Sequence, residues 1–121
     1  MWMKEVFGTD KPVIGLVHMH AMPTDPKFDP ATGVRGVLDA ARKDLHALQD
    51  GGIDGVLFCN EFSIPYTDDV QPVTIATMAR IIGELKPEIK VPLGVCVASN
   101  AEMGFDLAAA VEADFIREIL H

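Results

Sequence analysis

The sequence predicts an α/β chain in which parallel strands alternate with helices in the order β-α-β-α-β-α-β. Short apolar runs rich in β-branched residues, typical of strands buried on both faces, alternate with longer segments whose apolar residues recur at three- and four-residue steps. Polar residues follow each run at the same end, and neither the GxGxxG nor the GxxxxGKS/T nucleotide fingerprint follows the first run. The alternation predicts right-handed helical crossovers, and the polar residues favour a barrel over an open sheet.

The first strand is expected at about 12–18, where the run PVIGLV leads to His18. Residues 1–10 form a lead-in before it. Its large apolar residues are expected to plug the bottom of the core: Trp2, Val6 and Phe7. The loop over 19–30 contains three prolines, so it is predicted to be stiff and non-helical. Loops this long between a strand and a helix are often functional.

The first helix is predicted over 31–50, with a cap at Asp29-Pro30 and a left-handed stop at Gly51-Gly52. Its apolar stripe consists of Val34, Val37, Leu38, Ala41, Leu45 and Leu48. The remaining elements are expected as strands at about 55–59, 93–98 and 115–120, and helices at about 71–86 and 100–111. Pro72 opens the second helix, and Ser99 and Glu102 have capping-box spacing for the third.

Charge and composition exclude several classes of partner. The formal net charge of −8 argues against nucleic acid or an anionic membrane surface, although it permits a small phosphorylated ligand. No apolar stretch approaches the roughly 18–20 residues that span a bilayer, so no direct membrane insertion is expected. The two cysteines, Cys59 and Cys96, lie in apolar runs and are interpreted as buried, reduced packing residues. A cytoplasmic protein is therefore expected, and any membrane association would be through a protein partner.

The polar residues that follow the strands are the candidate site. The candidate catalytic residues are His18, Glu61 and Arg117, and the candidate substrate-binding residues are His20, Asn60, Asn100 and Glu118. Imidazole titrates near neutrality, so His18 is a candidate acid or base, and Glu61 is a candidate general base. Arg117, if it points inward, could bind an anionic substrate group. The structural alternatives are a hydrogen-bonded histidine at the edge of the core, a solvated carboxylate and a salt bridge.

Zinc binding by His18, His20 and Glu61 is a further alternative. The sequence does not show a fixed ligand set, so no metal site is assigned and the cofactor is left unknown.

Four segments together resemble the BtpA family: FGTDKPVIGLVHMHAMP, GGIDGVLFCNEF with its later PY, VPLGVCVASN and AAAVEADFIR. The resemblance implies a ribulose-phosphate-binding type of (β/α)8 (TIM) barrel, about twice this length, of which the chain matches the first half. The segment from His18 to Pro23 matches the family's motif, which more often reads His-Leu-Pro-Pro-Leu-Pro. In this chain His20 replaces a proline of that motif. Asn60-Glu61 matches the end of the family's second strand loosely, and Arg117 matches an arginine on its fourth.

The family is named for a protein of photosystem I biogenesis and has members beside sugar-uptake genes. The resemblance implies a barrel that binds or acts on a small sugar-type or phosphorylated metabolite. The alternatives are a non-catalytic assembly or stability factor for a protein complex, and an inactive fragment.

Four strands cannot close a barrel, because both edge strands keep unpaired backbone groups. Residues 1–121 are therefore expected to form a single partial barrel domain, truncated after the fourth strand. Such a domain is expected to associate with itself or with a missing C-terminal half.

Overall fold

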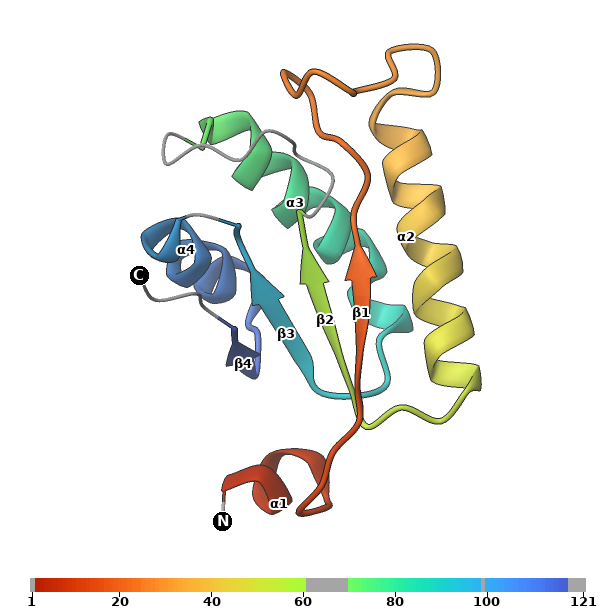
Figure 1. The fold of residues 1–121 in the computed structure, drawn as a ribbon, viewed down its shortest axis with the longest axis vertical. Helices are drawn as coiled ribbons and strands as arrows, with labels where there is room; N and C mark the ends of the chain where they lie inside the picture. Colours follow the sequence, from red (N-terminus) through yellow and green to blue (C-terminus); the bar gives the residue numbers. More distant parts are fainter. Residues whose placement is uncertain (1, 61–69, 99, 118–121) are drawn as a thin grey trace.

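A computed structural model describes residues 2–60, 70–98 and 100–117. Its sheet has four strands, β1 (Ile14–His18), β2 (Gly55–Cys59), β3 (Leu93–Cys96) and β4 (Phe115–Ile116). All three neighbouring pairs are parallel, and the strands lie in chain order, β1-β2-β3-β4 (Figure 1). A doubly wound sheet would reverse its order at a switch point. The predicted parallel α/β fold is confirmed, and the unbroken order is compatible with half of a (β/α)8 barrel.

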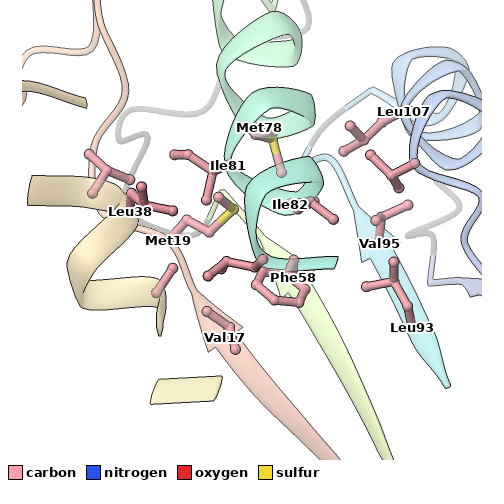
Figure 2. Close-up of a cluster of buried hydrophobic side chains, with 14 of the residues drawn as sticks. Val17, Met19, Leu38, Phe58, Met78, Ile81, Ile82, Leu93, Val95 and Leu107 are labelled. Carbon is pink, nitrogen blue, oxygen red and sulfur yellow. The ribbon is translucent and has the colours of Figure 1, made fainter. Parts of the chain in front are cut away.

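Three long helices, α2 (Gly33–Asp50), α3 (Pro72–Leu85) and α4 (Ala101–Val111), cover one face of the sheet. Alternate strand residues supply the sheet's part of the core: Val17, Val56, Phe58, Leu93 and Val95. They pack against apolar residues of the helices that include Leu45 and, labelled in Figure 2, Leu38, Met78, Ile81, Ile82 and Leu107. Because one cluster contains residues of all three helices, each crossover returns on the same side, as in a barrel wall.

The opposite face of the sheet, here called the inner face, carries a smaller buried cluster of Leu57, Cys59 and Cys96 packed with Phe115. At the N-terminal end of the strands, the short helix α1 (Trp2–Phe7) places the Phe7 ring 5.2 Å from the Phe115 ring. A Cβ atom at Gly55 would lie 2.6 Å from Phe7, so glycine is needed at this contact. Phe7 therefore plugs the base of the sheet, although the sequence predicted no helix there.

The starts of α2 and α4 differ from the predicted ones. Thr32, not Asp29, is the N-cap residue of α2. The Asp29 carboxylate instead accepts hydrogen bonds from Ala31 N (2.9 Å) and Thr32 Oγ1 (3.3 Å), which closes a turn just before the helix. The N-cap of α4 is Asn100, whose Oδ1 accepts from Met103 N at 3.0 Å, so the predicted capping box is wrong. Ser99 itself lies outside the described residues.

The helix ends agree better with the sequence. Gly52 has a φ of +85° and supplies the left-handed stop of α2. Helix α3 begins at Pro72 as predicted and is followed by a short 3-10 helix, η1 (Lys86–Glu88). Lys86 Nζ donates to the carbonyl oxygens of Val111 (2.6 Å) and Glu112 (3.0 Å), and so caps the C-terminus of α4.

The fourth strand is shorter than predicted among the described residues. Strand β4 contains only Phe115 and Ile116, and positions 118–120 of the predicted strand lie outside the description. Arg117 N still donates to Val95 O at 3.2 Å, which continues the β3–β4 pairing by one residue. None of the helices in the described parts of the chain is long and apolar enough to cross a membrane.

Candidate functional site

Four residues form a row on the inner face at the C-terminal edge of the sheet, one from each strand or its continuation. His18 pairs with Cys59, and Cys59 pairs with Cys96, as Cα partners in the parallel register. Arg117 extends the row, because Val95 pairs with Ile116 and the chain continues in register. Paired residues of a sheet point to the same face, so the four side chains share one surface. We call His18, Cys59, Cys96 and Arg117 the edge row.

The Arg117 side chain turns back along the edge row towards β2. Its Nη2 atom lies 3.7 Å from Cys59 Sγ and 3.7 Å from Cys96 Sγ. The two cysteines are 1% and 2% exposed, so the guanidinium rests on buried sulfur atoms. The inward orientation considered for Arg117 is thus observed. Guanidinium stays charged at all physiological pH values, so this edge of the sheet carries a fixed positive group.

The backbone of His18 lies at the other end of the edge row, three strand spacings of about 4.8 Å from the backbone of Arg117. His18 is half-buried, whereas His20 is exposed and follows the end of β1. Both histidines line a groove of about 420 Å³ along the edge of β1 that faces away from β2, together with Leu16, Asp44, Ala47 and Leu48. The sequence predicted one hollow for His18 and Arg117. The structure places them on one surface but does not bring their side chains into contact.

Two predicted substrate-binding residues make backbone contacts. Asn60 is 2% exposed, and its Oδ1 accepts from Ala98 N at 2.7 Å, which joins the ends of β2 and β3. Asn100 caps α4 through its side chain. Both residues therefore have a structural role at the sheet edge, and their binding of substrate stays a prediction. Glu61 and Glu118, the other predicted site residues of this edge, lie outside the described residues.

The described residues contain no group of three or more His, Cys, Asp or Glu side chains placed to hold a metal ion. The zinc alternative included Glu61, which the structure does not describe, so that alternative stays a hypothesis.

Sequence reasoning missed the contact between Arg117 and the two cysteines. Each cysteine was assigned to packing, which agrees with its burial but omits its charged neighbour. A signal was present in the sequence, since GVLFC and LGVC both end at cysteine. Two strands that end at the same register bring their last residues together, and this alignment predicts adjacent thiols.

Parallel βα units with a polar row at the C-terminal edge of the sheet define an α/β protein of the barrel-wall type. The chain belongs to the BtpA family, whose family model matches residues 9–121.

Three curated relatives illustrate the similarity. A putative sgc region protein, SgcQ, of Escherichia coli K12 is 53% identical over 118 residues, which is 98% of this chain and 44% of that protein. An uncharacterized Archaeoglobus fulgidus protein is 36% identical, over 89% of this chain and 43% of its own length. The photosystem I biogenesis protein BtpA of Synechocystis is 32% identical, over 93% and 39%. The chain thus spans less than half the length of these relatives. No solved structure matches it significantly.

Proposed function

We propose that the C-terminal edge of the sheet binds a small sugar-type or phosphorylated metabolite, with Arg117 as the group that holds its anionic part. The observation that carries the proposal is the Arg117 guanidinium on the inner face, beside Cys59 and Cys96. Barrels of parallel strands bind their ligands at this end of the sheet. The planar fork of guanidinium donors matches phosphate or carboxylate oxygens. The buried residues beneath the guanidinium lower the local dielectric constant, which strengthens its attraction to an anion.

In this proposal His18 lies at the far end of the ligand, where a sugar hydroxyl rather than the anionic group would reach it. The backbones of the two residues lie three strand spacings apart, but the guanidinium reaches back to Cys59, the direct strand partner of His18, so both groups could reach one small ligand with a charged part and a polar part. The His18 imidazole there would take a hydroxyl proton, which is the acid–base role predicted from the sequence.

Ligand binding is tested by thermal shift and calorimetry with pairs of sugars that differ only in a phosphate group. A ligand at 100 times its Kd stabilises a protein by about 2.7 kcal/mol, which a thermal scan detects easily. We expect a shift for at least one phosphorylated sugar and at least tenfold weaker binding by R117A. The matched control is R80A. Arg80 is an exposed arginine of α3 that forms an ion pair with Glu84 on the same helix. Equal binding by the two variants, or no shift with any sugar phosphate, would contradict the proposal.

A non-catalytic role as an assembly factor is the second candidate. Its supporting observation is the name of the Synechocystis relative, a photosystem I biogenesis protein. This role predicts that a protein complex captured by the chain stays bound when His18 and Arg117 are replaced by alanine. Loss of capture in that double variant, with the fold intact by circular dichroism, would favour the metabolite site instead.

A further inference from the structure

Cys59 and Cys96 stand directly opposite each other on neighbouring parallel strands, with both side chains on the inner face. Adjacent strands lie about 4.7–4.9 Å apart. That spacing falls within the Cα separation of roughly 4.4–6.8 Å that a disulfide requires. Neither cysteine is disulfide-bonded in this structure, so the pair is present in its reduced form. The Cα separation of the pair therefore lies within the range that a disulfide spans.

The two sulfur atoms also share one charged neighbour. Arg117 Nη2 lies 3.7 Å from each Sγ, and the Cys59 thiol lies 3.9 Å from Asn60 Oδ1. A positive charge beside a cysteine favours its thiolate, the form that reacts with oxidants and disulfides. Cysteines that serve only in packing need no such charge. The guanidinium favours the reactive thiolate form, whereas burial alone would oppose it.

We propose that Cys59 and Cys96 form a redox-active dithiol, which hydrogen peroxide converts into an intramolecular disulfide that links β2 and β3. Burial admits only a small oxidant, and peroxide is close to water in size. One thiolate attacks a peroxide oxygen, the O–O bond breaks, and the cysteine becomes a sulfenic acid as one water leaves. The second thiol then attacks that sulfur and displaces the sulfenic oxygen as another water. In total, two thiols lose two electrons and two protons, and one peroxide becomes two waters.

Disulfide formation would also change the site beside it. The guanidinium loses two ionisable neighbours when the sulfur atoms join, because a disulfide carries no charge. Oxidation thus alters the surroundings of Arg117 without altering Arg117 itself. The proposed chemistry is independent of the metabolite proposal, since it needs only the two cysteines, Arg117 and peroxide.

The test uses the folded chain treated with hydrogen peroxide, then denatured, alkylated with iodoacetamide and weighed by mass spectrometry. The reduced chain takes up one alkyl group at each cysteine. We expect the oxidised chain to take up neither and to be lighter by two hydrogen atoms, with peptide mapping that joins the Cys59 and Cys96 peptides. C59S and C96S are expected to give no intramolecular bond. Independent over-oxidation of each cysteine, or a disulfide that forms equally fast in the urea-unfolded chain, would overturn the proposal.

The contribution of the guanidinium is measured by the oxidation rate. Each unit by which the thiol pKa rises lowers the thiolate fraction up to tenfold, so R117M is expected to oxidise several-fold to tenfold more slowly than the native chain. R117K keeps the charge and should restore part of the rate, and R80A should match the native chain. An R117M rate equal to that of R80A would contradict the role of Arg117 and leave two thiols that react without it.

Discussion

Two aspartates, each placed directly before a strand, fix the start of the neighbouring strand. Asp54 Oδ2 accepts from Val13 N at 2.8 Å, while Asp54 N donates to Val13 O at 2.8 Å. Asp114 repeats the arrangement with Leu93: its Oδ2 accepts from Leu93 N at 2.8 Å and its N donates to Leu93 O at 2.6 Å. Each aspartate therefore bonds both polar groups of one residue, and the repeat sets the register at the N-terminal edge of the sheet.

Replacing Asp114 by alanine is expected to lower the free energy of unfolding by about 1–2 kcal/mol, because the partly buried Leu93 N–H loses a charged acceptor. The measurement is urea unfolding followed by circular dichroism. D106A is the matched control, since Asp106 is an exposed residue of α4 and such changes usually stay within about 0.5 kcal/mol. If the two variants unfold at the same urea concentration, the Asp114 hydrogen bond does not stabilise the sheet.

At the scale of whole elements, the sequence predicted the helix bodies and the start of α3 well, and the N-caps of α2 and α4 poorly. The stripe of α2 was visible because burial repeats with the helical period, and Val37, Leu38 and Leu45 are indeed buried. Caps depend on which of several nearby polar side chains reaches a free N–H group. In α4 the N-cap is Asn100, whereas the sequence analysis predicted Ser99, one residue earlier. Helix α1 could not be predicted, because its Phe7 is held by Phe115, far away in the sequence.

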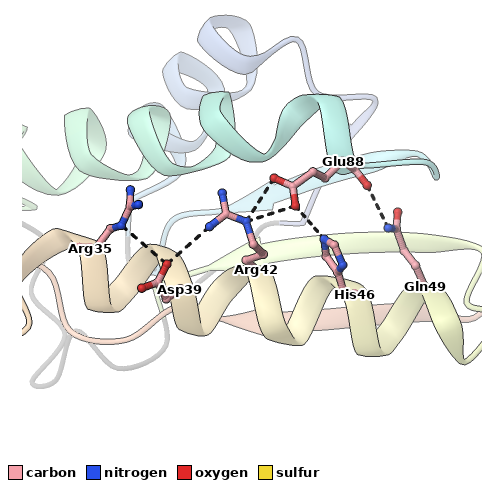
Figure 3. A network of polar contacts seen from close by, with 6 residues as sticks. All are labelled: Arg35, Asp39, Arg42, His46, Gln49 and Glu88. Carbon is pink, nitrogen blue, oxygen red and sulfur yellow. Dashed lines mark hydrogen bonds and ion pairs between the residues drawn. The ribbon is translucent and has the colours of Figure 1, made fainter.

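A polar network joins α2 to η1 (Figure 3). The Glu88 carboxylate accepts from Arg42 Nε at 3.2 Å and lies 2.7 Å from His46 Nε2. Gln49 Nε2 donates to Glu88 O at 3.0 Å, and Gln49 Oε1 accepts from Lys90 N at 2.6 Å. One helix face therefore holds the segment that leads into β3, through both side-chain and backbone groups of Glu88.

This network predicts a pH-dependent contribution to stability. The hydrogen bond with His46 is the largest effect and lowers the pKa of Glu88 below its ordinary 4.5; desolvation, the second largest, opposes it, and the hydrogen bond and charge of Arg42 lower the pKa further. A carboxylate whose pKa falls on folding stabilises the protein above its ordinary pKa, and that stabilisation is lost as the pH falls through the lowered value. The unfolding midpoint of E88Q is therefore expected to lie below that of the native chain at pH 6, and the gap should close as the pH drops below 4.5.

The measurement is a series of urea titrations across that pH range. E84Q serves as the control, because Glu84 forms an exposed pair with Arg80 at 3.6 Å and exposed pairs contribute little. A gap between E88Q and the native chain that stays constant from neutral to acidic pH would show that the carboxylate charge is not what the network uses.

For the whole molecule, the sequence was sufficient to predict the topology but only part of the site. Alternation of strands and helices constrains the chain to parallel pairs, and the structure has these pairs in chain order. The edge row follows from strand ends that share a register. The side-chain path of Arg117 does not follow from it, because several rotamers of a long side chain satisfy the same backbone. His18 and Arg117 come from the first and last strands of the sheet, and the strand register alone does not predict how close their side chains come.

Large apolar side chains are exposed along the two open sides of the described structure. Val13, Ile14 and Leu16 of the β1 side are 62%, 37% and 41% exposed, and Phe105 of α4 is 61% exposed. These are the sides on which a barrel would continue with further βα units. We propose that the chain associates through them, either with a second copy or with a C-terminal half of the kind that the longer relatives contain.

Light scattering after size exclusion is expected to show a dimer of this chain. L16D is expected to shift the dimer to a monomer, because association would bury the aspartate charge at the inner face of β1. V73D is the matched control, since Val73 is comparably exposed at 36% but lies at the start of α3, away from the sheet. If both variants keep the native mass, the inner side of β1 is not the interface. A native monomer that forms a stable complex when co-expressed with the remaining part of the Escherichia coli relative would assign the same surface to a C-terminal half.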